Sequence, residues 1–264
     1  VRLGQAEGLL GNKVYSLQTD NFGSVWIGTE RGLHKYNGSE FLTYNFFGKN
    51  ENGSIEIISD LILDKEGRLI ISGLVTGVYR LDITLGILEH FAYEKGFVRM
   101  ELDHQGILWG TNNGLFFLDM ENRLISEVDL HRTNPNMNIA FGVKEDSQKN
   151  IWIGLGQKIG VLDPERKAIR FIGEPEGLVV RTAYNFTEDK SGNVWITAFS
   201  TDAFSVSLQN SKIMHLGAAQ GYFGRTTDVF EDSMDRLWLI SNDTLTVYDQ
   251  ASSKMKKILT GSPI

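Results

Sequence analysis

Eight residues combine guanidinium groups, amide groups and aromatic rings, and together they could form a ligand-binding surface. They stand at or near the starts of predicted innermost strands: Asn12, Arg99, Asn138, Arg181, Tyr184, Tyr222, Phe223 and Arg225. A guanidinium group binds carboxylate or sulfate through paired hydrogen bonds, and an aromatic face can cover a sugar ring. This combination predicts binding of an acidic oligosaccharide. The alternative is that these arginines are solvated or pair with neighbouring carboxylates such as Glu174, Glu176 and Asp228.

Motifs for catalysis or metal binding are weak in this chain. The histidines do not cluster in the sequence as metal ligands would: they are His34, His90, His104, His131 and His215. Cysteine is absent, which excludes disulfides, thiolate metal sites and cysteine nucleophiles. Neither a Gly-x-Ser-x-Gly motif nor a phosphate-binding glycine loop occurs. The sequence therefore predicts no catalytic residue, no metal site and no cofactor.

Composition and charge narrow the class of protein further. The 264 residues include 26 Lys+Arg and 33 Asp+Glu, which gives a formal net charge of -7. An acidic chain is poorly suited to bind the phosphates of DNA or RNA, so no nucleic-acid partner is expected. No run of about 18 apolar residues occurs, so no segment is predicted to span a membrane. With 28 glycines and only 4 prolines, the composition indicates many tight turns between strands.

A repeat with a period of 44 residues organises the chain into six parts. Tryptophans recur every 43 residues from Trp109 to Trp238, and an aspartate stands six residues before each tryptophan. In the second repeat the aspartate is kept, but Ile70 takes the tryptophan place. The two columns are Asp20, Trp26, Asp64, Ile70, Asp103, Trp109, Asp146, Trp152, Asp189, Trp195, Asp232 and Trp238. Three residues before each aspartate is an apolar column: Leu17, Leu61, Met100, Val143, Phe186 and Val229.

Each repeat divides into four short runs that are rich in β-branched or aromatic residues and bounded by Gly, Asn or Asp. In the first repeat these runs are Val14–Thr19, Ser24–Gly28, Gly32–Tyr36 and Phe41–Tyr44. Four antiparallel strands in about 40–45 residues make one blade of a β-propeller. The predicted fold is therefore all-β, a single propeller over residues 1–264. Its six full blades are predicted at approximately 12–46, 55–93, 97–130, 138–173, 181–217 and 225–260.

The repeated aspartate and tryptophan have structural explanations. The Asp-x-x-Gly stretch is typical of a turn, because an Asp carboxylate accepts hydrogen bonds from nearby backbone N–H groups and Gly adopts positive φ. It does not match a calcium loop, since its acidic residues do not alternate around a glycine and no bidentate Glu follows. The tryptophan is predicted to pack between neighbouring blades, where its large apolar area would be buried.

The first repeat, GLLGNKVYSLQTDNFGSVWIGTERGLHKYNGSEFLTY (Gly8–Tyr44), resembles the two-component regulator propeller repeat. That family combines a Gly-Leu turn, Val-x-Ser, Asp-x-x-Gly-x-x-Trp-Ile-Gly-Thr, Gly-Leu-x-x-Tyr and Phe-x-x-Tyr. The resemblance covers the other repeats more loosely. Ile70 replaces the tryptophan in the second repeat, and Lys149 and Asp235 replace the turn glycine in the fourth and sixth.

The resemblance implies a sensor. Such repeats form the extracytoplasmic, periplasmic part of hybrid two-component system proteins, in which propellers precede a transmembrane helix and a histidine kinase. Their ligands are typically oligosaccharides released from glycans. The resemblance therefore implies that this portion is not an enzyme, that it binds an oligosaccharide, and that the signal passes to a kinase in the remainder of the polypeptide. It also implies a homodimer in the full-length form, with membrane contact only through segments not present here.

A seventh blade is also expected. The segment Val1–Leu3 aligns with Met214–Leu216, which is the predicted outermost strand of the fifth repeat. A terminal strand that pairs into the last blade of a propeller removes an exposed edge. The chain is therefore expected to begin with a lone outer strand of a closing blade, residues 1–3, whose partner strands lie outside the chain. The alternative is a six-bladed ring with a spare strand.

The sequence leaves two other functions open. The tryptophan-containing repeat also resembles propeller lyases that open cyclic esters, which would need a metal and a histidine base at the propeller mouth. A propeller face can alternatively serve as a platform for protein–protein interaction.

Overall fold

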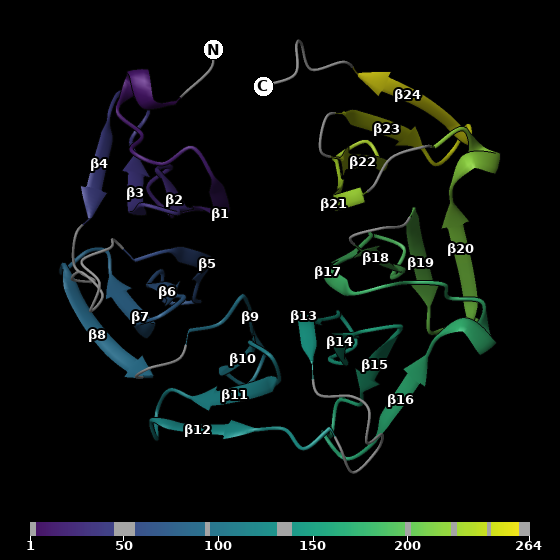
Figure 1. Ribbon diagram of the computed structural model, residues 1–264, viewed down its shortest axis with the longest axis horizontal. Helices are drawn as coiled ribbons and strands as arrows, with labels where there is room; N and C mark the ends of the chain where they lie inside the picture. Colours follow the sequence, from purple (N-terminus) through teal and green to yellow (C-terminus); the bar gives the residue numbers. More distant parts are fainter. Residues whose placement is uncertain are drawn as a thin grey trace. The chain divides into compact units, whose positions relative to one another are not determined.

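The computed structural model describes residues 4–44, 56–92, 96–130, 139–198, 202–222, 226–241 and 244–258. The chain divides into two compact units, Val1–Asp129 (unit 1) and Leu130–Ile264 (unit 2), which Figure 1 draws in purple to teal and in green to yellow. Each unit holds three four-stranded sheets in which the strands follow chain order. All neighbouring strands pair antiparallel, so each sheet is a propeller blade. The predicted all-β class with six four-stranded blades is confirmed, while the seventh blade stays a prediction.

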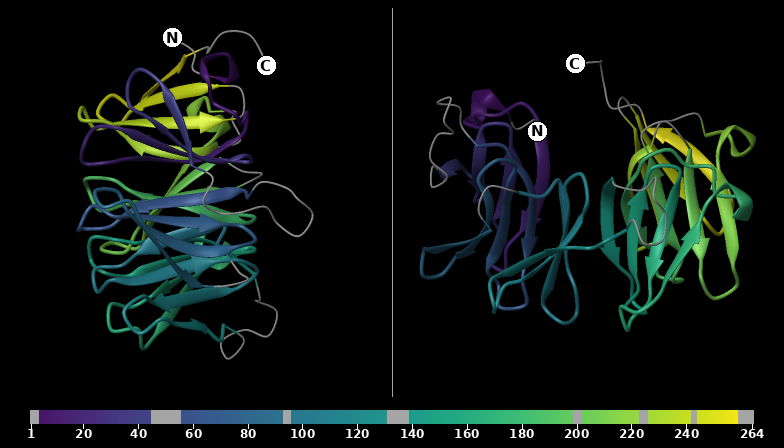
Figure 2. Two further views of the ribbon diagram at one scale, coloured as in Figure 1. Left: turned by 90° about the vertical axis from the view of Figure 1, so that its left-hand side faces the viewer. Right: turned by 60° about the horizontal axis from the view of Figure 1, so that its bottom comes forward.

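Unit 1 contains blades 1 to 3. Blade 1 is β1 (Val14–Thr19), β2 (Val25–Thr29), β3 (Gly32–Tyr36) and β4 (Phe41–Tyr44). Blade 2 is β5 (Ile58–Leu63), β6 (Leu69–Gly73), β7 (Gly77–Asp82) and β8 (Ile87–Ala92). Blade 3 is β9 (Arg99–Leu102), β10 (Ile107–Thr111), β11 (Leu115–Asp119) and β12 (Leu124–Glu127). Figure 2 shows the sheets of this unit lying face to face.

Unit 2 contains blades 4 to 6. Blade 4 is β13 (Ala140–Glu145), β14 (Ile151–Leu155), β15 (Lys158–Leu162) and β16 (Ile169–Ile172). Blade 5 is β17 (Ala183–Glu188), β18 (Val194–Ala198), β19 (Ala203–Ser207) and β20 (Lys212–Leu216). Blade 6 is β21 (Thr226–Glu231), β22 (Arg236–Ser241), β23 (Leu245–Asp249) and β24 (Lys254–Ile258). These blades contain the 24 strands of the described residues. No helix in the described part of the chain is long and apolar enough to cross a membrane.

The repeated tryptophan is the wedge that joins one blade to the next. Trp26 of blade 1 lies in one buried cluster with Ile58 and Leu61 of blade 2. Trp152 of blade 4 packs on Phe186 of blade 5, with 6.3 Å between ring centroids. Trp195 joins the core of blade 6 in the same way. Ile70, which replaces the tryptophan in blade 2, lies in the cluster with Phe97 and Met100 of blade 3. The column is therefore apolar because it fills the space between blades.

The repeated aspartate holds both the turn and the tryptophan. In blade 1, Asp20 Oδ1 accepts the backbone N–H groups of Phe22 and Ser24, each at 2.9 Å. Asp20 Oδ2 accepts the indole N–H of Trp26 at 2.9 Å. Because Ser24 is used in the turn, β2 begins at Val25, one residue later than predicted. The indole bond recurs at 2.8–2.9 Å in the four other blades that have the tryptophan.

Two glycines after the wedge allow the next blade to come close. A Cβ atom on Gly28 would lie 2.8 Å from the carbonyl oxygen of Ile58 in blade 2. A Cβ on Gly154 would collide with the carbonyl oxygen of Ala183 in blade 5. Only a residue without a side chain fits so close to the backbone of a neighbouring innermost strand. These glycines therefore set the distance between blades at the inner end.

Candidate functional site

The candidate ligand-binding site is the end of each unit at which the innermost strands begin. The turns between second and third strands lie at the same end, and polar side chains tie the two kinds of loop together. In blade 1, Glu30 accepts the backbone N–H groups of Asn12 and Lys13, each at 2.9 Å. Burial raises the pKa of Glu30, but these hydrogen bonds outweigh it and hold the pKa below its ordinary value. The loop before β1 is thus fixed by an ionised carboxylate.

Blade 2 makes the reverse connection. Glu56, which precedes β5, is buried and accepts the N–H groups of Val75 and Thr76 in the turn between β6 and β7, at 2.9 and 3.1 Å. In blade 3, the amide of Asn112 donates to the carbonyl oxygen of Gly96 at 2.7 Å. The described loops at this end of unit 1 are therefore held in defined conformations, which suits a binding surface.

A repeated turn shapes this end in unit 2. The one-turn 3-10 helices η2 (Glu174–Glu176) and η3 (Ala218–Gln220) each stand between two glycines, as does η1 (Gln5–Glu7) in unit 1. The second glycine has positive φ in each case, at 107° for Gly8, 92° for Gly177 and 80° for Gly221. The next residue, Leu178 after η2 and Tyr222 after η3, is buried between blades. These turns therefore anchor the chain just before it enters an innermost strand.

The predicted ligand-binding residues of unit 1 occupy different environments. Asn12 is exposed beside Glu30. Arg99 is half-buried at the start of β9, and one of its guanidinium N–H groups donates to the carbonyl oxygen of Val98 at 3.3 Å. The charge of Arg99 also acts on the carboxyl of Asp60 in blade 2. Arg99 therefore already interacts with other groups of the fold.

In unit 2 the structure brings two of the predicted residues together. The Tyr184 hydroxyl donates to the carbonyl oxygen of Thr226 at 3.4 Å, and the Tyr222 hydroxyl lies 2.7 Å from the Thr226 hydroxyl. Tyr184 is half-buried, but Tyr222 is only 3% exposed and offers little surface to a ligand. Arg181 is exposed and has no ion pair with another described residue. Asn138, Phe223 and Arg225 lie outside the described residues.

The proposed pairing of Arg181 with nearby carboxylates is not seen among the described residues. Glu176 accepts the backbone N–H of Gly173 at 2.7 Å, and Asp228 accepts the side-chain amide of Asn185 at 2.7 Å. Both carboxylates are thus used inside the fold. Arg181 is the one predicted arginine in the described residues that is both exposed and unpaired.

A polar network on the innermost strands was not predicted from the sequence. Asp60 of blade 2 accepts the hydroxyl of Ser16 from blade 1 at 3.1 Å and the backbone N–H of Met100 from blade 3 at 2.7 Å. Burial raises the pKa of Asp60, and the hydrogen bonds and Arg99 only partly oppose this. Asn185 and Asp228 form the equivalent link in unit 2. In the sequence, the members of this network are polar residues that stand directly before the apolar column. In the structure, the innermost strands have a β-bulge at this position.

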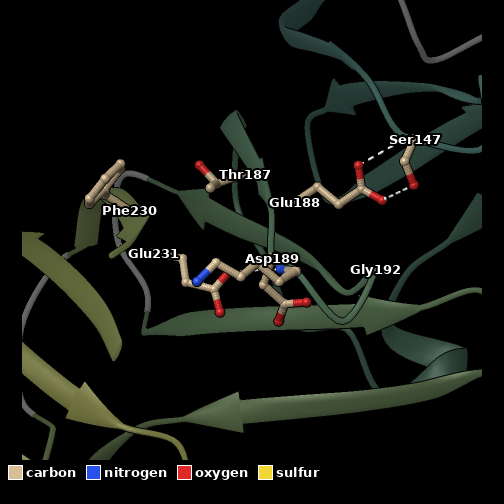
Figure 3. Close-up of a pocket in the computed structure, with 8 residues that line it drawn as sticks. Ser147, Thr187, Glu188, Asp189, Gly192, Phe230 and Glu231 are labelled. Carbon is tan, nitrogen blue, oxygen red and sulfur yellow. Dashed lines mark hydrogen bonds between the residues drawn. The ribbon is translucent and has the colours of Figure 1, made fainter. Parts of the chain in front are cut away.

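Unit 2 also has a pocket of about 430 Å³ at the opposite end, beside the aspartate turns. Figure 3 shows the Glu188 carboxylate pointing at Ser147, whose N–H and hydroxyl donate to it at 2.7 and 2.6 Å. In the next blade, Glu231 accepts the backbone N–H of Lys190 at 2.7 Å. These glutamates cross-link the turns of neighbouring blades, so the polar groups of the pocket already have partners within the fold.

None of the described histidines lies on an innermost strand, because three are on third or fourth strands and His104 is in the turn after β9. His90 on β8 stacks on Tyr79, and His215 on β20 stacks on Phe204, at 4.2 and 4.5 Å between ring centroids. His34 is buried in β3, and His104 follows the turn aspartate of blade 3. His131 lies outside the described residues. Within the described ranges, no group of three or more His, Asp or Glu side chains is placed to hold a metal ion.

The fold and the repeat define the class of protein as a β-propeller built from wedge-and-turn blades. Residues 8–31, in the first repeat, match the model of the two component regulator propeller family. This match runs from the turn glycine Gly8 through β1 and the Asp20 turn to the end of β2. It confirms the resemblance stated for that repeat. No curated protein matches the chain in sequence.

Similar solved structures include two extracellular domains of putative hybrid two component systems from B. thetaiotaomicron. The chain is similar to that of BT3049 with a TM-score of 0.81 at 17% identity, covering 100% of this chain and 37% of that chain. For BT4673 the TM-score is 0.80 at 20% identity, covering 99% and 34%. Virginiamycin B lyase from Staphylococcus aureus has a TM-score of 0.76 at 12% identity, covering 96% and 87%. The chain thus spans just over a third of the two-component domains.

Proposed function

We propose that this chain is a ligand-sensing, extracytoplasmic propeller of a hybrid two-component signalling protein. The observation that carries the proposal is the family match of the first repeat, in which the Asp20–Trp26 pair and the Gly8 turn stand where the repeat needs them. The similarity of fold to two extracellular domains of such systems supports it. A periplasmic location follows from this assignment.

The ligand in this proposal is an acidic oligosaccharide bound where the innermost strands begin. Arg181 supplies an exposed guanidinium group, and Tyr184 lies three residues further along the same chain segment. A free guanidinium group binds carboxylate or sulfate more tightly than a paired one, because no internal ion pair has to be broken. The remaining predicted residues, Asn12, Arg99, Asn138, Phe223 and Arg225, would extend this surface, with Tyr222 supporting it from the core.

The output of the sensor lies outside this chain in the same proposal. A bound ligand would change the state of the remaining polypeptide, which would carry a histidine kinase and act as a homodimer. Binding by the propeller can shift such an equilibrium only if the two states bind the ligand differently. The chain itself therefore needs to bind its ligand and transmit force, and it needs no cofactor.

Calorimetric titration tests the ligand class directly. The chain is titrated with sulfated and uronate-containing oligosaccharides, chosen from a glycan array. The double variant Arg181→Ala, Arg225→Ala should lose binding by about a hundredfold or more, because two charged hydrogen bonds are removed. Arg170→Ala on the outer strand β16 removes an exposed arginine elsewhere and should leave the affinity unchanged. Equal affinities for all three proteins would contradict the proposed site.

The two alternative functions, a lyase and a platform for protein–protein interaction, would give different experimental results. A lyase would show turnover of a cyclic ester that depends on a divalent metal. A protein platform would retain a protein partner and bind no sugar. The similarity to virginiamycin B lyase concerns the fold, so it favours neither activity.

A further inference from the structure

The chain that leads into β17 turns over at Thr182. Val179 and Arg181 are exposed on either side of the buried Val180, so burial alternates there as in an extended chain. Unbroken alternation would expose Ala183, yet this residue is fully buried in the same cluster as Val180, in the core between blades 4 and 5. The side of the chain that faces the core must therefore change between Arg181 and Ala183, which is the place of Thr182.

Thr182 makes this change with a backbone conformation that β-branched residues rarely adopt. Its φ is 58°, in the left-handed region, where a branched side chain crowds the backbone. The equivalent residues, which directly precede the innermost strands β1, β5 and β13, lack positive φ: Lys13, Ile57 and Ile139. The entry into blade 5 is thus built differently from the entries into blades 1, 2 and 4.

The backbone hydrogen bonds at these entries differ as well. In blades 1 and 2, the carbonyl oxygens of Lys13 and Ile57 accept an N–H from the turn between the second and third strands of the same blade, at 3.3 and 2.9 Å. The N–H of Thr182 instead donates to the carbonyl oxygen of Gly156, in the β14–β15 turn of blade 4. Because this N–H belongs to the peptide bond that follows Arg181, the hydrogen bond places Arg181 beside a turn of the preceding blade.

Gly156 borders open space at this turn. It is exposed, and a Cβ atom on it would meet no atom within 4 Å outside its chain neighbours. In blade 1 the equivalent residue after β2 is Glu30, whose carboxylate fills this place by accepting the N–H groups of Asn12 and Lys13. The glycine removes both the side chain and the negative charge, so an anion can approach the turn in blade 4.

We propose that Thr182 is the positioning residue for Arg181, and that the anionic group of the ligand binds between blades 4 and 5, at Arg181 and the open side of the Gly156 turn. This subsite rests on the proposed function, because its ligand is the acidic oligosaccharide of that proposal. Arg181 supplies the positive charge, Gly156 leaves the room, and the hydrogen bond of Thr182 holds one beside the other. Such preorganisation raises affinity, since the ligand does not have to order the loop.

Calorimetry with trigalacturonate and with a sulfated chondroitin disaccharide tests the subsite, and the two probes separate carboxylate from sulfate recognition. Gly156 has no positive φ, so other residues fit its backbone. Gly156→Phe fills the open space and should weaken binding of the recognised probe about tenfold or more. The matched control Pro164→Phe adds the same ring at an exposed position of the β15–β16 turn, at the opposite end of blade 4, and should leave the affinity unchanged.

Variants of Thr182 test the positioning role. Thr182→Pro excludes the left-handed conformation and removes the N–H donor, so it should also weaken binding about tenfold or more. Thr182→Gly keeps both and should bind within about threefold of the wild type. It should also raise the midpoint of urea denaturation, whereas Lys13→Gly should lower it, because Lys13 has no positive φ to relieve. Circular dichroism shows which variants fold, and Gly156→Phe tests the subsite if Thr182→Pro does not.

The outcomes separate this subsite from the proposed function. If the wild type binds a probe and Gly156→Phe binds it equally well, the subsite is overturned and the ligand class stands. Unchanged affinity of a folded Thr182→Pro, or a lowered midpoint of Thr182→Gly, would overturn the positioning role. Binding of neither probe by the wild type would contradict the acidic ligand class itself, and the subsite with it.

Discussion

Blades 2 and 4 solve the same packing problem with different residues. In blade 4, Trp152 fills the space against blade 5 and its indole N–H donates to Asp146 at 2.8 Å. In blade 2, Ile70 fills the space against blade 3, and Arg68 Nε donates to Asp64 Oδ2 at 2.7 Å. The tryptophan therefore has two separable roles, wedge and donor. Blade 2 divides these roles between Ile70 on β6 and Arg68 in the turn directly before that strand.

The largest effect is expected where both roles are lost together. Trp152→Ala removes a fully buried ring and leaves Asp146 Oδ2 with only the side-chain amide of Asn150. Such a cavity costs about 3–5 kcal/mol of the free energy of unfolding, and urea denaturation measures it. A cost under about 1 kcal/mol would place the ring outside the blade interface.

Loss of the wedge alone should lower the unfolding free energy somewhat less than loss of both roles. Ile70→Ala leaves the Arg68–Asp64 pair intact but removes a side chain that is fully buried against blade 3. The expected loss of unfolding free energy is about 2–5 kcal/mol. Hydrogen exchange should show faster opening of β9 and β10 than of β1 and β2 in this variant. Uniform acceleration over unit 1 would mean that the wedge does not act locally.

Loss of the donor alone should have the smaller effect. Trp152→Phe keeps an aromatic wedge, and Arg68→Met keeps a long side chain in blade 2. Each should lower the unfolding free energy by about 0.5–1.5 kcal/mol, with Arg68→Met at the lower end because the Arg68 side chain is partly exposed. Equal costs for Trp152→Phe and Trp152→Ala would show that the hydrogen bond outweighs the apolar packing.

The dependence of stability on pH separates the turn aspartate from the innermost-strand aspartate. Burial raises the pKa of Asp20, but hydrogen bonds from Trp26, Ser24 and Lys35 hold it below the ordinary 3.8. Its contribution is therefore present above pH 3.8 and is lost as the pH falls through the folded pKa. Burial raises the pKa of Asp60, so its contribution is present at low pH and lost as the pH rises through the folded pKa.

Asp20→Asn and Asp60→Asn should consequently change the pH profile in opposite directions. The unfolding free energy of the wild type minus that of Asp20→Asn should decrease as the pH is lowered. The corresponding difference for Asp60→Asn should decrease as the pH rises toward neutral. Denaturation at a series of pH values gives both differences. The same slope for the two variants would contradict the opposite environments of these carboxylates.

The repeat made most of the fold predictable. Regular spacing of Asp20, Trp26 and their equivalents located the blades, and runs of β-branched and aromatic residues bounded by Gly, Asn or Asp located the strands. The role of Arg68 was missed, because the donor moved two residues from the tryptophan position and left the column apolar. The link from Glu188 to Ser147 was missed as well, since it joins two blades and leaves no local pattern.

The candidate ligand site was less predictable than the blades. Its residues lie in loops of unequal length, where the environment of a side chain depends on neighbouring blades. Tyr222 looked available for a ligand, but the turn after η3 carries its ring into the core. Arg181 follows a similar turn and stays exposed. Only the tertiary contacts distinguish these two residues.

A double-mutant cycle tests the division between wedge and donor most directly. Asp64→Ala is combined with Arg68→Met and, separately, with Ile70→Val, and unfolding free energies are measured by urea denaturation. We expect a coupling free energy of about 0.5 kcal/mol or more between positions 64 and 68 and of less than about 0.3 kcal/mol between positions 64 and 70. The combination of Asp146→Ala with Trp152→Phe should give a coupling free energy similar to that between positions 64 and 68. Strong coupling of Asp64 with Ile70, or none with Arg68, would contradict this division.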